Sequence, residues 1–396
     1  MPATLTTVSA ILKEIYEGSM NDQLNNDVVA LKRIQKTSDG VSSDVGGKYV
    51  VFPIKTTRNA GIGARNELEA LPSPGQQGVS SGRVGLKYLY GSVRMSGQTF
   101  ELANTNPQAF MSTLDLEMEG LKTDLQKDLN RQVYGDGTGA IATVTATYTT
   151  ANVVTVASVQ YVQLGEQIDI LQSNGTVIGS NRKVTAINTT AKTVTFDGAA
   201  ISGVATNILV RTGNYNREWT GLAKIVNSSG TLYNIDPTVD TVWVSSVDSN
   251  SGVLRALSES LMINMVDAIR TNGGNVSLIL QNLGVRRAYF NLLVQQRRYS
   301  NTKDFGGGFS GLAFTTDQGE IPVVADVDAP PSTQYYLSEK QLKWYRESDW
   351  SFMDRDGSKW LRVSGYDAYD ATMYQYSELG THRRNAHGVI KDITEA

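Results

Sequence analysis

The clearest hydrophobic pattern lies in the first third of the chain. Apolar residues recur every three or four positions from Leu114 to Val133, through Met118, Leu121, Leu125 and Leu129. This spacing predicts one helix over residues 107–134, which at 1.5 Å per residue is about 40 Å long. Gly135 is expected to take the left-handed conformation that ends a helix. Acid–base pairs are expected on the outer face of this helix at Glu119/Lys122, Asp124/Lys127 and Asp128/Arg131.

Two alternating segments before this helix predict strands, over residues 48–55 and 83–94. The stretch between them, residues 59–82, is polar and rich in glycine and proline. A loop of this length without periodicity is usually functional or contacts a partner. We therefore expect a long two-stranded arm with a flexible tip. Short amphipathic helices are expected before it over residues 6–36, in an arm too small for a core of its own.

The composition shifts at residues 140–211 toward Thr, Val, Asn and Gly, in short apolar–polar runs. Turn dipeptides separate these runs, Asn-Gly at residues 174–175 and Asp-Gly at residues 197–198. The pattern predicts an inserted, mostly antiparallel β domain of about six short strands, shaped as a small barrel.

Helices and strands alternate in the rest of the chain. Apolar residues from Leu254 to Ile269 predict a helix that ends at residues 272–274, and residues 285–293 predict another. A buried strand is expected between these helices, over residues 276–280. Further strands are expected at residues 321–324, 335–337, 343–345 and 361–363. The chain is therefore expected to be of the α+β class.

Composition and charge are typical of a folded globular protein. Of 396 residues, 40% are hydrophobic and 19% are charged, and the formal net charge is -3. This balance argues against a dense basic field for nucleic acid or anionic lipid. The absence of cysteine excludes disulfides, thiol catalysis and cysteine-ligated metals. Neither a signal peptide nor a membrane-spanning stretch is predicted.

Three glycine-rich motifs have weak catalytic or phosphate-binding signals. Residues 78–82 match Gly-x-Ser-x-Gly, but a nucleophile elbow needs a strand before Ser80 and a helix after it, so a loop tip is expected. Residues 135–139 follow a helix rather than a strand, which predicts a helix stop. Residues 305–309 lack the Gly-Lys-Ser/Thr of a phosphate loop, which predicts a mobile loop.

Metal and cofactor sites are also not expected. His382 and His387 lie beside arginines that would repel a cation, and residues 354–357 lack the acid that completes a calcium loop. The chain is thus well patterned without a catalytic constellation, while its arms are too extended to be stable alone. Extended arms need neighbours that bury their apolar sides, which predicts a self-assembling structural protein.

The order of elements resembles one protein family. An N-terminal arm, a long hairpin and a long helix ending in GDGTG (135–139) are followed by GLAKIV (221–226). Two helices then flank residues 276–281, and GEIPVV (319–324) and RRNAHGVI (383–390) follow. In this order and spacing, the chain resembles the major capsid proteins of tailed bacteriophages with the Hong Kong 97 fold, over nearly its whole length except the insertion.

The resemblance implies seven segments. They are an N-terminal arm (1–45), an extended loop over a neighbouring subunit (46–97), a peripheral domain with the spine helix (98–139), the inserted β domain (140–212), a connection back to the peripheral domain (213–239), an axial domain (240–335) and the peripheral return strands with the C-terminus (336–396).

The resemblance also implies the function and the partners. Many copies would assemble in the host cytoplasm, as hexamers and pentamers, into the icosahedral shell of a virion. The shell would enclose double-stranded DNA through weak, non-specific contacts. A portal protein is an implied partner, together with scaffold and cement or decoration proteins, but no membrane, cofactor, metal or enzymatic activity is implied. A modest negative charge suits this task, because tight binding of DNA to the inner wall would obstruct packing.

Two departures from the family lead to further expectations. Some relatives cross-link a loop lysine to a neighbour's asparagine, but no lysine occurs between Lys55 and Lys87, so we expect a non-covalent shell. The insertion is expected to face outward, where it would brace neighbouring capsomers or receive a cement protein.

Candidate residues follow from the same resemblance. Hinges between flat and bent arrangements are expected at Gly46, Gly47, Gly61 and Gly97. Candidate contacts between subunits are Arg65, Glu67, Glu69, Arg83, Arg383 and Arg384, and weaker DNA-proximal candidates are Arg286, Arg287, Arg297 and Arg298.

Three alternatives stay open at this point. Shells of bacterial encapsulin nanocompartments share the fold, but they need a cargo-binding inner groove that the sequence does not reveal. The second alternative is a secreted or tail-associated β-rich binding module, which would need only residues 140–212. The long helix and the missing export signal argue against this alternative. The third alternative is a hydrolase, whose activity the substitution Ser80→Ala would abolish.

Overall fold

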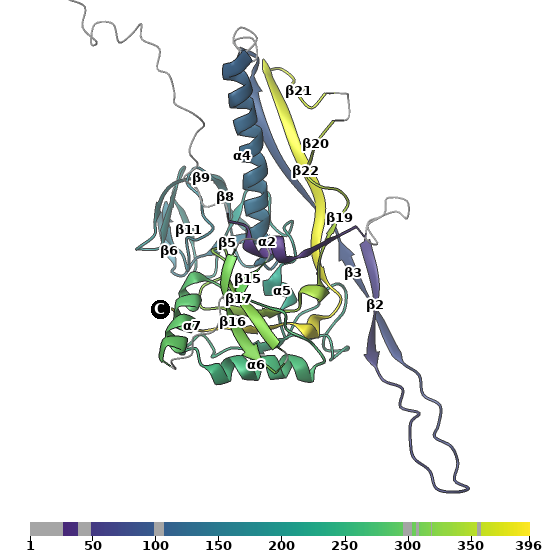
Figure 1. Cartoon of the computed structure of the whole chain (residues 1–396). Coiled ribbons are helices and arrows are strands. Elements are labelled where there is room, and N and C mark those ends of the chain that lie inside the picture. Colours follow the sequence, from purple (N-terminus) through teal and green to yellow (C-terminus); the bar gives the residue numbers. More distant parts are fainter. Residues whose placement is uncertain are drawn as a thin grey trace, which may run out of the picture.

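The computed structural model describes residues 27–38, 49–98, 107–295, 303–305, 309–317, 319–354 and 358–396 (Figure 1). The predictions for residues 6–26, Gly46, Gly47, Arg297, Arg298 and residues 355–357 lie outside these ranges. The described helices are α2 (Val29–Arg33), α4 (Pro107–Val133), α5 (Leu222–Ile225), α6 (Glu259–Thr271) and α7 (Leu283–Gln295), with 3-10 turns η2 (Glu339–Gln341) and η3 (Arg384–Ala386).

A seven-stranded sheet forms the body, in the order β13-β23-β18-β14-β17-β16-β15. Its strand β14 (Leu278–Gln281) is buried at every position, as its apolar run predicts. It runs parallel to β17 (Gly319–Ala325) and antiparallel to β18 (Gln334–Leu337). Side chains of α6 and α7 share an apolar core with this sheet. The other strands of the sheet are β13 (Ser246–Asp248), β15 (Lys303–Phe305), β16 (Phe309–Thr316) and β23 (Gly388–Ile390).

A second sheet supports the long helix α4. Its strands follow the order β1-β19-β22-β20, and β4 and β21 also pair with β22. β22 (Ala368–Thr381) runs antiparallel to β4 (Lys87–Ser96), from Ala368 opposite Ser96 to Ser377 opposite Lys87. α4 lies along this pair (Figure 1), with Leu121 and Leu125 packed over Gly91 of β4. The remaining strands are β1 (Gln35–Thr37), β19 (Leu342–Arg346), β20 (Ser351–Phe352) and β21 (Leu361–Arg362).

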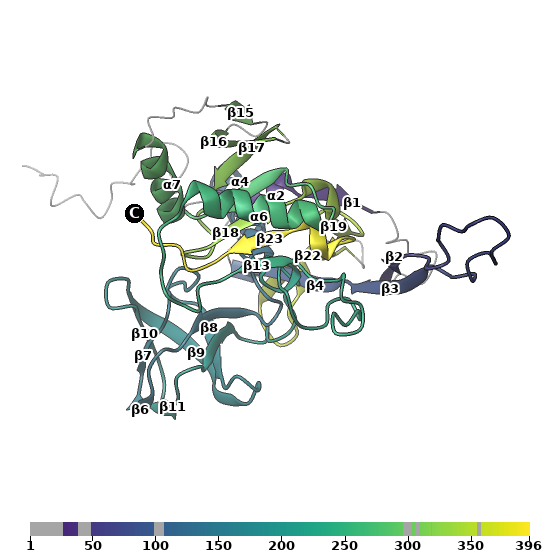
Figure 2. The same ribbon diagram turned by 90° about the horizontal axis from the view of Figure 1, so that it is seen from below.

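β2 (Tyr49–Thr57) and β3 (Gly78–Gly85) form the expected two-stranded arm, which projects from the body (Figure 1 and Figure 2). The prediction of one strand over residues 83–94 is wrong, because the chain changes partner at Leu86: β3 pairs with β2, whereas β4 pairs with β22. The prediction of a loop tip at residues 78–82 is also wrong. Ser80 lies inside β3, and its Oγ donates to Oδ2 of Asp240 at 2.8 Å.

Residues 140–211 form an antiparallel module with an apolar core of its own. It has eight strands: β5 (Ala140–Thr143), β6 (Tyr148–Ala151), β7 (Val153–Thr155), β8 (Gln167–Leu171), β9 (Val177–Asn188), β10 (Thr193–Phe196), β11 (Ile201–Gly203) and β12 (Ile208–Arg211). Six of them form a sheet in the order β5-β12-β8-β9-β10-β7, and β6 pairs with β11. Just beyond β5 and β7, Val144 bridges Val156.

Helix α4 is present as predicted, but its end differs. Gly135 is not left-handed; the N–H groups of Tyr134 and Gly135 donate to the carbonyls three residues back, each at 3.0 Å, which tightens the last turn. The ion pair of Asp128 and Arg131 forms at 2.9 Å but faces the inserted module rather than solvent. Lys127 pairs with Asp328 at 2.9 Å.

Two other boundaries differ from the predictions. α6 starts at Glu259, because the Ser258 hydroxyl caps the N–H of Leu261 at 3.2 Å, so Leu254 precedes the helix. Phe305 and Phe309, expected in a mobile loop, end β15 and begin β16 and pair with each other. The hydrophobic pattern did not predict the strands β1, β13, β15, β16, β20, β22 and β23. No helix within the described ranges is long and apolar enough to cross a membrane.

Candidate functional site

The loop between β2 and β3, residues 58–77, projects away from the body (Figure 1) and carries three candidate residues. Arg65 Nε donates to the carbonyl of Ala70 at 2.9 Å. The Glu69 carboxylate accepts from the backbone N–H of Asn66 at 2.9 Å and from its side-chain amide at 3.0 Å. Arg65 and Glu69 are therefore bonded within their own loop, whereas Glu67 makes no hydrogen bond or ion pair with any described residue.

Apolar side chains on this arm are uncovered in the single chain. Ile62 and Leu71 are each 85% exposed, and Leu68 is fully exposed. On the strands below them, Val51 and Val79 are also exposed. Clusters of exposed apolar residues mark interaction sites, so the arm is the strongest candidate contact surface of the described chain.

Arg384 is wrongly predicted as an intersubunit contact. Its side chain is fully buried, and its guanidinium donates to carbonyl oxygens at the end of α5 and just after it: Ile225 at 3.1 Å, Gly230 at 2.9 Å and Ser229 at 2.8 Å. A buried cation bonded to its own chain cannot reach a neighbour. Its sequence neighbour Arg383 is exposed, with Nη2 donating to the carbonyl of Gly273 at 2.8 Å.

Three other arginine candidates within the described residues, Arg83, Arg286 and Arg287, are exposed. Arg83 lies on β3, and Arg286 and Arg287 lie on α7. Arg287 donates to the carbonyl oxygen of the C-terminal residue Ala396. The roles of these arginines beside a neighbouring subunit or DNA stay predictions.

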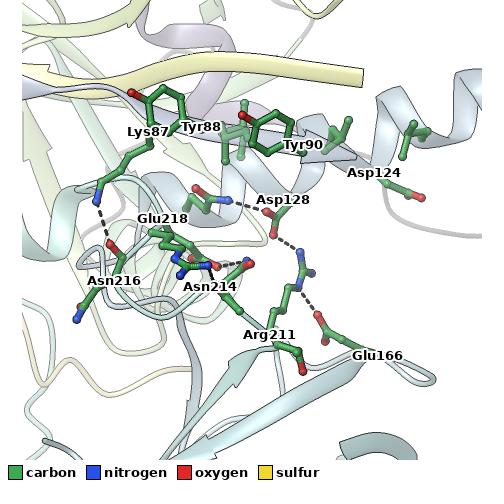
Figure 3. A pocket seen from close by; sticks show the side chains of 18 of the residues that line it. Lys87, Tyr88, Tyr90, Asp124, Asp128, Glu166, Arg211, Asn214, Asn216 and Glu218 are labelled. Atoms are coloured by element: carbon green, nitrogen blue, oxygen red, sulfur yellow. Dashed lines mark hydrogen bonds and ion pairs between the residues drawn. The ribbon is translucent and has the colours of Figure 1, made fainter. Parts of the chain in front are cut away.

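A cleft of about 820 Å³ lies between α4, β4 and the inserted module (Figure 3). One wall is apolar and includes Leu121, Leu125 and Trp350. We call it the acidic cleft after the four carboxylate residues that line it: Asp124, Asp128, Glu166 and Glu218. Three cations, Lys87, Arg211 and Arg217, line it as well.

Arg211 of β12 joins the inserted module to α4 in this cleft. Its Nη1 donates to Asp128 at 2.5 Å, and its Nε donates to Glu166. Arg131 of α4 donates to Asp128 at 2.9 Å and to Glu218 at 2.7 Å. Burial would raise the pKa of Asp128, but the charges of Arg131 and Arg211 outweigh it and hold this pKa below its usual range. The network therefore fixes the module on the helix.

A second buried junction holds α2, α4 and the inserted module together at the turn after β17. The Asp326 carboxylate accepts from the N–H of Ala30 at 2.9 Å, from the Tyr134 hydroxyl at 3.0 Å and from the Asn130 amide at 3.1 Å. In the same turn, the carbonyl of Asp328 accepts from the Tyr161 hydroxyl at 2.6 Å. This junction was not predicted from the sequence. Asn130 could have indicated it, because a polar residue on the core-facing side of a helix needs a buried hydrogen-bond partner.

The candidate catalytic groups serve packing. His387 is buried, with Nδ1 accepting from the N–H of Ser338 at 3.3 Å, and burial together with the Arg383 charge lowers its pKa to about 3. It is therefore neutral at physiological pH. No cluster of His, Asp and Glu within the described ranges could hold a metal ion.

Comparison with known families supplies the deciding observation. The family model described as SU10 major capsid protein matches residues 67–394, which is most of the chain. The chain belongs to the SU10 major capsid protein family. As a major capsid protein of a tailed phage, it associates with copies of itself to form the icosahedral capsid of the virion. Its role is structural rather than enzymatic.

Solved structures share the fold of this capsid protein over nearly its whole length. A chain of the Cyanophage A-1(L) capsid has a TM-score of 0.64 at 14% identity, covering 99% of this chain and 100% of that chain. A chain from Mycobacterium phage Bobi has a TM-score of 0.51 at 8% identity, with 99% of each chain covered. The SrpI encapsulin of Synechococcus elongatus PCC 7942 has a TM-score of 0.50 at 7% identity, with 100% and 96% covered.

At these identities the likeness shows the fold alone, and it confirms the predicted Hong Kong 97-like α+β capsid fold. The match to an encapsulin therefore does not favour a nanocompartment, whereas the family match favours the phage capsid. A comparison with curated proteins found no match.

Proposed function

We propose that this capsid protein assembles non-covalently, as hexamers and pentamers, around packaged double-stranded DNA. The observation that carries the proposal is the projecting arm, whose apolar side chains Ile62, Leu68 and Leu71 have no cover in the single chain. Ordering a backbone residue costs about 1–2 kcal/mol, so contacts with neighbouring copies are needed to hold such an arm. A portal protein, a scaffold and cement proteins complete the proposed set of partners.

Electron microscopy with light scattering of the purified chain tests this assembly. We expect closed shells or rings of five and six subunits. If the chain stays monomeric even when it is co-expressed with the scaffold of its own phage, the proposal is wrong.

We further propose that the seven segments predicted from the sequence are the working parts of the subunit, and that residues 140–212 form an outward-facing, barrel-like module. The separate core and the bridge between Val144 and Val156, beyond the two edge strands, support a closed barrel. The ends of the module lie close together, because the N–H of Asn216 donates to the carbonyl of Thr138 at 3.0 Å. Such a unit can brace neighbouring capsomers or receive a cement protein.

Replacing residues 140–212 by a short glycine–serine linker tests the module. We expect the subunit to fold, because the other two cores share no residue with the module, but to give fewer and less heat-resistant shells. A matched control keeps the module and carries Arg211→Gln, which removes its ionic attachment to Asp128 of α4 together with the pair of Arg211 and Glu166 inside the module. Unchanged yield, heat resistance and decoration after the deletion would refute the proposed role.

Contact with DNA is proposed to be weak and non-specific. The net charge of -3 excludes a strong overall attraction to phosphate, and the exposed pair Arg286/Arg287 is a local site for such contacts. The variant Arg286→Ala/Arg287→Ala should assemble like the parent. Its shells should retain less DNA at low salt, where electrostatic contacts are strongest. If variant and parental shells retain the same amount of DNA at every salt concentration, these two residues do not contact DNA.

A further inference from the structure

The tip of the projecting loop is a preformed turn. Besides the bonds of Arg65 and Glu69, the N–H of Glu69 donates to the carbonyl of Asn66 at 3.2 Å. Leu68 inside this turn has a φ of 66°, in the left-handed region that is unfavourable for a residue other than glycine. Strain of this kind persists where the surrounding bonds fix the backbone, and it concentrates at functional positions.

This turn presents an apolar side chain between two acids. Leu68 is fully exposed, and Glu67 and Glu69 flank it. Hydrogen bonds from Asn66 lower the pKa of Glu69, so this carboxylate keeps its charge in mildly acidic solution. The tip is therefore an apolar knob with a negative rim.

A second cleft, of about 690 Å³, lies at the base of the same hairpin. We call it the basic cleft, because Lys55, Arg58 and Arg383 line it and none of its lining residues is acidic. Its apolar lining comes from Pro53, Ile54, Val242 and Trp243. Burial and the nearby Lys343 charge lower the pKa of His382, another lining residue, which is consistent with a positive local field.

We propose that the knob formed by Leu68, with its rim of Glu67 and Glu69, docks into the basic cleft of a second copy of this chain. The inference rests on the proposed self-assembly and names the residues that make one of its contacts. Charge favours the basic cleft, because its three cations face no acidic lining residue and attract the rim. In the acidic cleft, Asp128, Glu166 and Glu218 already pair with Arg131 and Arg211, so it offers the rim no comparable excess of positive charge.

The contact must join different copies. The loop extends away from the body in both views, so a tip cannot fold back into the cleft at its own base (Figure 1 and Figure 2). Each subunit then donates one tip and accepts another. A contact of this head-to-tail kind forms a ring where its rotation closes, as the proposed hexamers and pentamers require.

Cross-linking tests the contact directly, since the natural chain has no cysteine and gives no background. Shells of the Leu68→Cys/Val242→Cys variant, treated with a short bis-maleimide, should run on denaturing gels as a ladder that extends beyond the dimer. The matched control, Leu68→Cys/Tyr90→Cys, places the second cysteine in the acidic cleft and should give no ladder. A ladder in the control, a dimer from Leu68→Cys alone, or well-formed shells without any ladder would overturn the docking while leaving self-assembly intact.

Exchanging the charges of the two partners provides a second test of the docking. This test still applies if the cysteine variants do not form shells. Glu67→Lys and Arg58→Glu should each raise the concentration needed for assembly about three- to tenfold, as expected for one lost ion pair per subunit. The double variant should regain the parental value, whereas Lys359→Glu, at an exposed cation that does not line the cleft, should leave it unchanged. Failure of the double variant to recover would contradict the pairing.

The basic cleft could instead bind phosphate. Gel-shift titration of a short duplex DNA with the parental chain and with Arg58→Glu distinguishes binding of DNA in this cleft from docking of the loop tip. If the variant loses DNA binding and assembles like the parent, the cleft contacts nucleic acid and the docking proposal is wrong. If it binds DNA like the parent and assembles poorly, the docking proposal is supported.

Discussion

At the residue scale, buried polar side chains hold the peripheral part of this capsid protein together by bonding to the backbone. Arg384 donates to carbonyls at the end of α5 and just after it. Glu378 of β22 accepts from the N–H of Thr220 at 2.7 Å and from that of Leu379 at 3.0 Å. Both side chains connect the C-terminal strands to the segment that follows the inserted module. Their burial makes them sensitive to substitution and to pH.

Removing the Arg384 guanidinium should destabilise the subunit. Arg384→Met leaves several buried carbonyls without a donor, and each such loss costs about 1–3 kcal/mol, so we expect a total of at least about 3 kcal/mol. Urea unfolding of the unassembled subunit measures this change. Arg383→Met, at the exposed neighbouring position, is the control and should change stability by less than about 0.5 kcal/mol. Equal effects of the two substitutions would contradict the role of Arg384.

Glu378 should make stability fall as the pH rises. Burial raises its pKa from 4.5 to about 8, against the lowering effect of hydrogen bonds and the Lys87 charge. Between these values the folded chain keeps a proton that the unfolded chain has lost, so the stabilisation is full below the lower value and lost toward the upper one. In Glu378→Gln, urea unfolding should show a smaller loss of stability between pH 5.5 and pH 8.5.

The exposed Glu117→Gln provides the control for this pH dependence. It should reproduce the parental profile. A Glu378→Gln profile as steep as that of the parent would mean that another group carries the pH dependence.

At the element scale, the long helix α4 is fixed at both its side and its end. Leu121 and Leu125 pack over Gly91 on β4, and Gly221, at the start of α5, lies against the carbonyl end of α4. A Cβ on Gly221 would come closer than 3.0 Å to the carbonyl oxygens of Gln132 and Val133. The start of α5 therefore tolerates only glycine at this contact.

Two glycine substitutions should act in opposite directions. Gly221→Ala should destabilise the subunit by about 2–3 kcal/mol, because backbone carbonyls cannot move aside as a flexible side chain can. Gly120→Ala, inside α4 with no atom within 4 Å of the new methyl group, should stabilise it by about 0.5–1 kcal/mol through helix propensity. Thermal and urea unfolding of both variants measure the two changes. Destabilisation by Gly120→Ala, or tolerance of Gly221→Ala, would contradict this packing.

At the scale of the whole molecule, the projecting arm and the attached module set how copies meet. The arm is a two-stranded ribbon with a bonded tip, and the module is held on α4 by Arg211 and on the turn after β17 by Tyr161. The subunit thus offers a rigid body with one reaching element. We propose that contacts through such an element join neighbours without a covalent bond.

Purified shells should dissociate fully in hot detergent. The loop between Lys55 and Lys87 contains no lysine for an isopeptide bond, and the chain contains no cysteine for a disulfide. We expect a single band at 43.0 kDa on a denaturing gel of boiled shells whose closure has been verified by electron microscopy. A ladder of larger species would show covalent linkage and contradict the non-covalent shell.

The sequence by itself determined the elements whose signal is local. The apolar spacing of α4, α6 and α7, the run in β14 and the composition of the inserted module are properties of neighbouring residues, and the structure confirms them. The order of these elements was enough to indicate the capsid family. The bonded tip was not predicted, but its residues Arg65, Glu67 and Glu69 were named as contacts between subunits, because the loop contains no lysine for a covalent cross-link.

Only the tertiary structure decided features that depend on partners distant in sequence. β22 was not predicted from the hydrophobic pattern, because Gln375, Ser377 and Glu378 are buried in it. Polar residues at buried positions disrupt the apolar–polar alternation by which a strand is recognised. The change of partner at Leu86, the burial of Arg384 and the junction at Asp326 join residues tens to hundreds of positions apart. Hydrogen bonds and charges of this kind depend on which surfaces meet, and the hydrophobic pattern of one segment carries no information about its partner.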